Sequence, residues 1–149
     1  MDFYEQLVHY YLTVVERFPV LPQIKVTRST AGTPWAAKPD FLALDFAGKR
    51  ILIVQVKTTD RRNFDQQAAG LAETLKSEHR NNVESCVRDE ILAKQLHFFP
   101  IHCRFYVREA NVQALECKDD YVQYKKEFGT AEVVPLELVF NVLKDRMPR

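Results

Sequence analysis

The sequence is short of several features, and each shortage excludes a class of protein. Only 4 of its 149 residues are glycine, which excludes collagen-like and glycine-rich low-complexity chains. No apolar run approaches the roughly 18 residues that a membrane-spanning helix needs. The N-terminus carries an acid at Asp2 and no basic segment, so a secretory signal peptide is not expected.

Cysteine is also scarce and widely spaced. The three cysteines, Cys86, Cys103 and Cys117, are an odd number, are widely spaced and lack the set of cysteine and histidine neighbours that a zinc site needs. This spacing predicts free thiols, no disulfide framework and no structural zinc site, as is usual in a reducing compartment. We therefore expect a cytoplasmic protein that has no membrane partner.

A strong basic charge, which many nucleic-acid-binding proteins carry, is missing, because the formal net charge is only +1. Residues 49–62 nevertheless hold five basic residues against the single acid Asp60. The five are Lys49, Arg50, Lys57, Arg61 and Arg62. This segment is either a basic patch or an ordinary solvated turn, and the sequence favours neither.

Hydrophobic periodicity in the first part of the chain alternates between helix and strand patterns. Apolar residues at helical spacing, including Phe3 and Val14, predict an amphipathic helix over residues 3–18 that ends near Pro19. Alternating polar and apolar residues predict a strand over residues 23–30, and two apolar runs predict strands over residues 40–46 and 51–58, with a tight turn at Gly48 between the last two.

The second part of the chain begins with a long proline-free stretch. It predicts one helix over residues 64–97, or two helices that are broken near Asn81. A fourth strand is expected over residues 101–107. Further along we expect a helix, a short strand and a helix, over residues 121–128, 132–134 and 136–146.

These elements define an α/β fold with a central mixed sheet flanked by helices. Their order is helix-strand-strand-strand-helix-strand within a core of about residues 3–107, followed by an α/β extension over residues 108–149. With 46% hydrophobic and 28% charged residues, no internal repeat and no linker, the chain is predicted to be one domain over residues 1–149.

The most informative pattern is Pro39-Asp40 followed, fifteen residues after the acid, by Gln55-Val56-Lys57. If Gly48-Lys49 is a two-residue hairpin turn, paired positions sum to 97 and Asp40 lies opposite Lys57. Gln55 then shares a face with Lys57, since residues two apart in a strand point the same way. Asp45 faces the other side of the sheet and is a poor candidate for the same site.

These residue types suit the hydrolysis of phosphodiester bonds. Asp40 offers an anionic oxygen to Mg²⁺ or Mn²⁺, and the Gln55 amide and the Val56 carbonyl offer neutral oxygens. Lys57 can orient the attacking water and offset the charge that develops on the phosphate. The structural alternative is that Gln55 and Lys57 form the solvated face of an edge strand and that Asp40 only begins a strand.

On these residues the chain resembles the PD-(D/E)xK nuclease superfamily, which has the restriction-endonuclease-like fold. Pro39-Asp40 matches the first half of the motif, and Gln55-Val56-Lys57 stands at the (D/E)xK position with glutamine in place of the acid. The order of elements matches the family core. The resemblance implies a metal-dependent nuclease acting on duplex or branched DNA, with its site on the second and third strands.

The resemblance also brings in residues outside the motif. Many family members add a glutamate from the first helix, and here the candidates are Glu5, which its early position favours, and Glu16. Some members carry a glutamine in the helix after the lysine, a position that Gln66 or Gln67 could fill. For each of these residues, an ordinary polar surface position is the alternative.

Other candidates carry weaker functional signals. Trp35, in the loop before Asp40, could stack on a nucleic-acid base or anchor the loop. The four histidines are scattered and are expected to be structural or on the surface. Double-strand cleavage by so small a protein needs two active sites, which favours a homodimer. Because glutamine lacks the charge of the acid, the alternative function is an inactive nuclease-like domain that binds nucleic acid or a protein partner.

Overall fold

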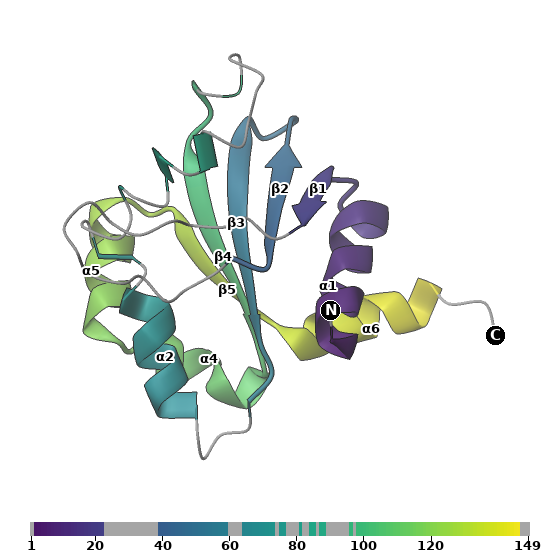
Figure 1. Ribbon diagram of the computed structural model, residues 1–149. Helices are drawn as coiled ribbons and strands as arrows, with labels where there is room; N and C mark the ends of the chain where they lie inside the picture. Colours follow the sequence, from purple (N-terminus) through teal and green to yellow (C-terminus); the bar gives the residue numbers. More distant parts are fainter. Residues whose placement is uncertain are drawn as a thin grey trace.

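A computed structural model describes residues 2–22, 39–59, 64–73, 75–76, 81, 84–85, 87–88, 96 and 98–146. Its centre is a five-stranded sheet with the order β1-β2-β3-β4-β5 (Figure 1). The first three strands run antiparallel to one another, whereas β3, β4 and β5 run parallel. The strands are β1 (Val20–Pro22), β2 (Phe41–Asp45), β3 (Arg50–Lys57), β4 (Ile101–Val107) and β5 (Ala131–Pro135).

Helices cover both faces of the sheet. On one side lie α1 (Phe3–Tyr10), its π-helical continuation η1 (Tyr11–Val15) and α6 (Leu136–Arg146) (Figure 1). On the other side lie α2 (Phe64–Glu73), α4 (Val112–Glu116) and α5 (Asp119–Glu127), with the short 3₁₀ turn η3 (Glu109–Asn111) leading into α4. The predicted α/β class with a mixed sheet flanked by helices is thus confirmed.

The central strand β3 shows why this sheet is covered on both faces. Ile51 and Ile53 are buried in the hydrophobic cluster beneath α2, α4 and α5, whereas Leu52 and Val54 are buried in the cluster beneath α1 and α6. An unbroken apolar run is typical of a strand that is covered on both sides. The β5 strand of the expected C-terminal extension joins this same sheet, so the extension enlarges the core.

One of the expected elements has a different boundary in the structure. The helix α2 ends at Glu73, and the N–H of Leu75 donates to the carbonyl of Ala72, three residues back, so the helix expected over residues 64–97, or broken near Asn81, ends earlier than expected. The strand expected over residues 23–30 lies outside the described residues. In the described part of the chain, no helix is both long and apolar enough to cross a membrane.

The hairpin between β2 and β3 differs from its expected register by two residues. Asp45 pairs with Arg50 and Phe41 with Val54, so paired positions sum to 95 and the predicted sum of 97 was wrong. The connection has four residues, 46–49, instead of two. Since side chains alternate with a period of two, this shift leaves every residue on its predicted face.

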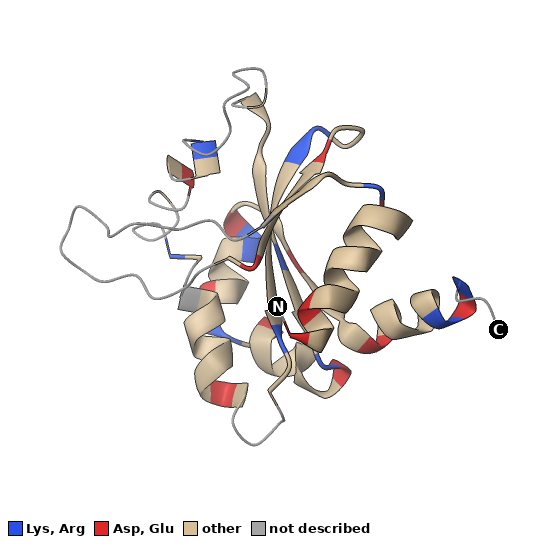
Figure 2. Cartoon of the chain, turned by 45° about the vertical axis from the view of Figure 1, so that its right-hand side comes forward, with Lys and Arg blue, Asp and Glu red and all other residues tan. Residues whose placement is uncertain are grey.

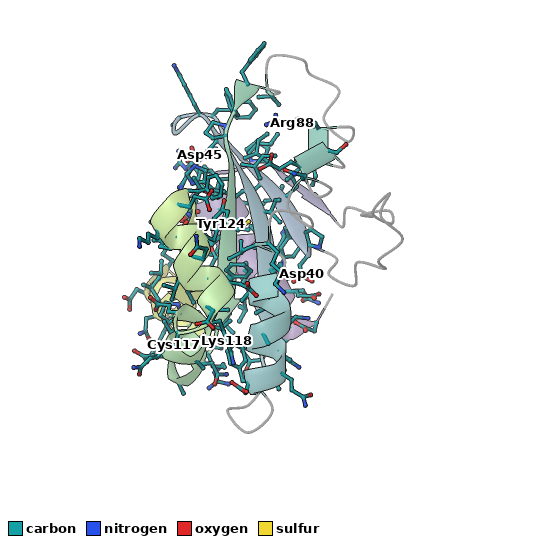
Figure 3. All side chains as sticks on the ribbon, turned by 90° about the vertical axis from the view of Figure 1, so that its left-hand side faces the viewer. Asp40, Asp45, Arg88, Cys117, Lys118 and Tyr124 are labelled. Atoms are coloured by element: carbon teal, nitrogen blue, oxygen red, sulfur yellow. The ribbon has the colours of Figure 1, made fainter. Side chains whose placement is uncertain are left out.

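The side chain of Asp45 explains the wider turn. Its Oδ1 accepts the N–H of Gly48 at 2.8 Å, and its Oδ2 accepts the Nε–H of Arg50 at 2.8 Å. A Cβ on Gly48 would lie only 2.4 Å from Asp45 Oδ2, so the turn has no room for a side chain there. Asp45 is therefore a structural residue at the end of β2 far from Asp40 (Figure 3).

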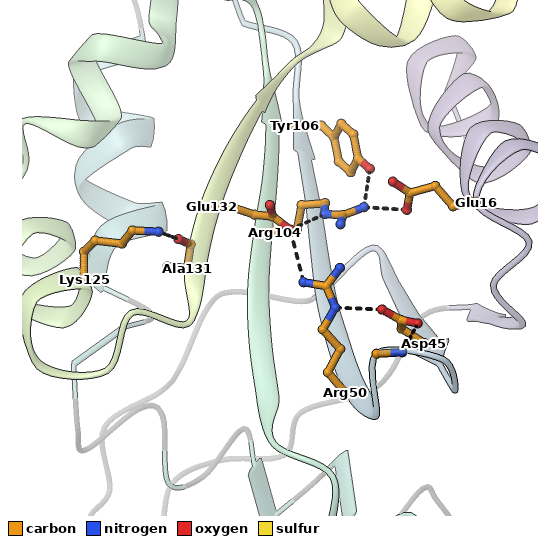
Figure 4. Close-up of polar contacts among 9 residues, drawn as sticks. Glu16, Asp45, Arg50, Arg104, Tyr106, Lys125, Ala131 and Glu132 are labelled. Carbon is orange, nitrogen blue, oxygen red and sulfur yellow. Dashed lines mark hydrogen bonds and ion pairs between the residues drawn. The ribbon is translucent and has the colours of Figure 1, made fainter.

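A buried arginine holds the α1 side of the molecule to the sheet (Figure 4). Arg104 of β4 is 5% exposed and donates to Glu16, just after η1, at 2.7 Å, to Glu132 of β5 at 2.7 Å and to the Tyr106 hydroxyl at 3.1 Å. Burial opposes its charge, but Tyr106, Glu16 and Glu132 outweigh burial and raise the pKa of Arg104 above its usual range. The guanidinium thus stays charged and links three separate elements.

We predict that Arg104→Ala lowers the free energy of unfolding by about 3 kcal/mol, because it removes the buried guanidinium and leaves the partly buried Glu16 and Glu132 without their counter-charge. Urea denaturation at pH 7 measures this loss. The matched control is Arg108→Ala, since Arg108 is 46% exposed and pairs with Glu137 at 3.1 Å. The control should cost less than about 1 kcal/mol, and equal losses for the two variants would contradict a bridging role for Arg104.

Candidate functional site

Asp40 lies immediately before β2, where the pairing with β3 is irregular. Its N–H donates to the carbonyl of Val54 at 2.9 Å, although Val54 already pairs with Phe41. Two residues of one strand thus face one residue of the other, which is the arrangement of a β-bulge. The bulge re-aims the Asp40 side chain along the edge of β3 instead of across the ladder.

The Asp40 carboxylate reaches the end of β3. Its Oδ2 accepts the N–H of Val56 at 2.7 Å. The regular β2–β3 pairing stops at Val54, so Asp40 supplies the partner that β2 would otherwise give to Val56. The N–H and carbonyl of a strand residue point to the same neighbouring strand. The Val56 carbonyl therefore also faces the side where Asp40 lies.

Glu5 is the second carboxylate at this place. It belongs to the first turn of α1, where it forms a capping box with Asp2. The Glu5 N–H donates to Asp2 Oδ1 at 2.8 Å, and Glu5 Oε2 accepts the Asp2 N–H at 3.1 Å. These two hydrogen bonds at the start of the helix hold Glu5 in a fixed orientation next to Asp40.

The pKa of Asp40 is raised from its ordinary value of 3.8 to about 6. Burial is the largest cause, and the nearby charge of Glu5 and a hydrogen bond shared with Glu5 raise the pKa further. The hydrogen bond from Val56 and the charge of Lys57 act in the opposite direction. Glu5, Asp40 and Lys57 are therefore electrostatic neighbours, as the sequence predicted for Asp40 and Lys57.

Glu16 lies at the other end of the helix and has a different role. It binds Arg104 at 2.7 Å, and eleven residues of helix place it about 16 Å from Glu5. The choice between the two glutamates, which the sequence left open, falls on Glu5. The π-helical segment η1 directly precedes Glu16, whose N–H donates to the carbonyl of Tyr11, five residues back. No sequence pattern predicted this segment.

Gln55 is adjacent to the site in sequence, but its side chain faces the other layer. It is 5% exposed and lies on the same face of β3 as Ile53, which packs toward α2. Among the described residues, no hydrogen bond joins the Gln55 amide to Asp40. Lys57 follows at the exposed end of the strand. The structure thus brings Asp40, Glu5, Val56 and Lys57 together. The Gln55 side chain faces the layer of α2 instead.

A group of polar contacts continues beyond Lys57. The Thr59 hydroxyl donates to Gln67 Oε1 of α2, whereas Gln66 points to solvent. Asn111 donates its Nδ2–H to the Thr59 carbonyl at 2.8 Å and is 1% exposed. Of the two candidate glutamines, Gln67 is the one that faces the end of β3. Sequence analysis missed Asn111, and no motif or spacing marked it.

Of the remaining candidates, Trp35, Arg61 and Arg62 lie outside the described residues. Lys49 lies in the turn just before β3 and Lys57 ends that strand, so the two positions are about 26 Å apart and the described basic residues do not form one patch. His9 packs its ring edge-on against Phe41 at 5.5 Å, which agrees with a structural histidine.

The donor set fits a divalent cation with oxygen ligands. Glu5 and Asp40 provide two carboxylates, the Val56 carbonyl faces the same place, and the raised pKa of Asp40 reflects buried negative charge that a cation would neutralise. The described residues hold no group of three or more His, Cys, Asp and Glu side chains that could bind a metal. Any metal here would therefore depend on amide, carbonyl or water oxygens as well.

No protein-family model, curated protein or solved structure matches this chain. The chemistry of the site is accordingly argued from its own residues. At one end of the sheet, a cation can be bound by two carboxylates and a backbone carbonyl. The nearby lysine can place a positive charge beside an anionic substrate. Among the described residues, His102 and Cys103 of β4 and Cys117, just after α4, are not part of this group.

We predict that Asp40→Asn stabilises the metal-free protein at pH 7 by about 1 kcal/mol. Two pKa units correspond to about 3 kcal/mol, and we reduce this value because Asp40 is only partly buried. Asparagine keeps an oxygen for the Val56 N–H and removes the charge that Glu5 repels.

The gain should depend on pH. The proton on Asp40 stabilises the fold fully below about pH 3.8, and this contribution is lost as the pH rises through about 6. Urea denaturation should therefore find the two proteins nearly equal at pH 4 and different at pH 7. Asp65→Asn, at a position whose side chain is 84% exposed, is the control. A constant difference across this range would contradict the raised pKa.

Proposed function

We propose that this protein is a divalent-metal-dependent nuclease that hydrolyses phosphodiester bonds of DNA. The observation that carries the proposal is the convergence of Glu5 and Asp40 with Lys57 at the ends of β2 and β3. The three residues come from α1, the start of β2 and the end of β3, so the fold itself brings them together. The proposal includes a restriction-endonuclease-like arrangement of the sheet.

In the proposed site, Asp40, Glu5 and the Val56 carbonyl hold Mg²⁺ or Mn²⁺. When bound, such a cation supplies charge stabilisation at the phosphate and lowers the pKa of a bound water. Asp40 is oriented for this role by its 2.7 Å bond from Val56. Lys57, at the exposed end of β3, would offer its ammonium to a phosphate oxygen and help to orient the attacking water.

The motif Pro39-Asp40 with Gln55-Val56-Lys57 supports the same proposal through its resemblance to the PD-(D/E)xK superfamily. The order of described elements, α1-β1-β2-β3-α2-β4, agrees with the core of that family. We propose duplex or branched DNA as the substrate, a homodimer as the cutting unit and the cytoplasm as the compartment.

We predict that the wild-type protein cuts DNA in the presence of Mn²⁺ or Mg²⁺ and that Lys57→Ala lowers the cleavage rate about 100-fold or more, since a positioned proton-transfer or charge-stabilising group contributes about 10²–10⁴. Gel assays with linear, supercoiled and branched DNA measure the rate. Lys49→Ala is the matched control, because Lys49 is exposed at the opposite end of β3.

The outcomes separate the proposal from its alternative. Cleavage that both Lys57→Ala and Asp40→Asn abolish supports the nuclease. Cleavage that persists in both variants would assign the activity to a contaminant or to another site. If no substrate is cut and calorimetry detects no Mn²⁺ binding, the nuclease proposal fails.

A second candidate function is an inactive nuclease-like domain that binds nucleic acid or a protein partner. The observation that favours it is Gln55, which is neutral, 5% exposed and directed toward the α2 layer. A neutral amide contributes less than a carboxylate to cation binding, because it lacks a full charge. In this case DNA binding should survive without metal and without Lys57.

We predict that Gln55→Glu strengthens Mn²⁺ binding about tenfold, which corresponds to about 1.4 kcal/mol, if position 55 belongs to the metal site. The same change should lower the melting temperature of the metal-free protein, because it buries an unpaired charge. Calorimetry and thermal melts with and without Mn²⁺ measure both effects.

Gln66→Glu, at an exposed position of α2, is the control for added charge. It should change neither Mn²⁺ affinity nor stability appreciably. If Gln55→Glu destabilises the protein equally with and without Mn²⁺, position 55 is not a metal ligand, and the inactive-domain alternative gains support.

A further inference from the structure

The first helix has two apolar sides, although the sheet covers only one of them. Val8 and Leu12 are fully buried against the sheet. We expected Phe3 and Val14 on the apolar side of an amphipathic helix, but they are 59% and 43% exposed. Tyr10, beside them, is 51% exposed. With the half-buried Leu7, these residues form what we call the outer stripe: Phe3, Leu7, Tyr10 and Val14.

The outer stripe has the spacing of a helix–helix seam. Phe3, Leu7 and Tyr10 are separated by four and three residues, which is the alternation of the a and d positions in a coiled coil, and Val14 follows four residues later within the wider π-helical turn of η1. No Lys, Arg, Asp or Glu occurs between residues 6 and 15, as the uncharged middle of α1 in Figure 2 shows. An uncharged stripe with this spacing fits a second helix better than a flat surface.

The same stripe is complementary to itself. When two copies of α1 lie antiparallel about a two-fold axis, Phe3 of one copy faces Val14 of the other, and Leu7 faces Tyr10. Each large ring then meets a smaller side chain, so the same four residues form both halves of the contact. Such an interface, made by one patch on both subunits, is typical of two-fold homodimers.

Charge complementarity favours the same arrangement. The exposed Asp2 stands at the beginning of α1 and the exposed Arg17 just after its end, so the antiparallel pairing brings the acid of each copy near the base of the other. The helix dipoles also oppose each other in this orientation. We propose that the outer stripe binds the outer stripe of a second copy of this chain, forming an antiparallel homodimer.

The pairing leaves the candidate site open. At 100° per residue, Glu5 lies nearly half a turn around α1 from the centre of the outer stripe, on the side that faces Asp40. At the N-terminal end of the stripe, the ring of Phe140 from α6 lies 6.2 Å from that of Phe3 and widens the apolar surface. This dimer does not depend on the proposed nuclease activity.

Sedimentation equilibrium of the full chain tests the proposal. So small a patch predicts a weak dimer, with a dissociation constant on the order of 10–100 μM. Tyr10→Glu and, separately, Phe3→Ser should weaken association at least tenfold while thermal melts show a folded protein. Val122→Glu is the matched control, because Val122 is 50% exposed on α5, in the opposite helix layer.

A wild-type protein that stays monomeric at all concentrations overturns the proposal. A dimer that is equally strong in wild type, Tyr10→Glu and Phe3→Ser also overturns it, because the contact then lies on another surface. Weakening by Val122→Glu as strong as by Tyr10→Glu has the same consequence.

Cross-linking tests the direction of the helices. In a Cys86→Ser, Cys117→Ser background, a Phe3→Cys protein mixed with a Val14→Cys protein should form a mixed dimer with a short bismaleimide. Phe3→Cys alone should not cross-link to itself, because its two thiols would be separated by eleven residues of helix, about 16 Å. Efficient self-cross-linking of Phe3→Cys, without the mixed product, would indicate parallel helices and overturn the antiparallel arrangement.

Discussion

The buried guanidinium of Arg104 is the interaction on which the geometry of the site depends. It joins Glu16 at the end of the first helix to β4 and, through Glu132, to β5. A buried ion cluster contributes little net stability compared with apolar packing, but each partner becomes costly when it is left alone. This cost fixes the helix at one orientation over the sheet, and that orientation places Glu5, at the opposite end of the same helix, beside Asp40.

The faces of the paired residues in the β2–β3 hairpin could be predicted from sequence even though the pairing register could not. Faces depend only on a period of two, so an error of two residues left the residues of β2 and β3 where alternation had put them, whereas the bulge before β2 re-aimed Asp40 along the edge of β3. The register depends on the turn, and the turn depends on the hydrogen bonds of Asp45 to Gly48 and Arg50. Those bonds are tertiary details of one carboxylate, and the composition of the turn does not reveal them.

The structure also separated candidates that were equivalent by sequence. Glu5 and Glu16 lie on the same flank of a helical wheel, and the choice between them comes from Arg104, which lies 88 residues from Glu16 in sequence. Likewise, Gln67 differs from Gln66 only through its contact with Thr59. Asn111 could not be found at all, because its importance comes from a single bond to a distant carbonyl. Local sequence patterns can identify such residues as candidates, but only their contacts with residues far away in sequence show which role each one has.

The glutamine at position 55 is consistent with the electrostatics of this site. Glu5 and Asp40 already repel each other enough to contribute to the raised pKa of Asp40. A third carboxylate, at a position that is 5% exposed, would add a buried charge whose only strong compensation would be a bound cation. A neutral amide lowers this cost when no cation is bound, and it also lowers the attraction for the cation. In the proposed metal site, position 55 would therefore be where the stability of the metal-free fold and the affinity for metal oppose each other most directly.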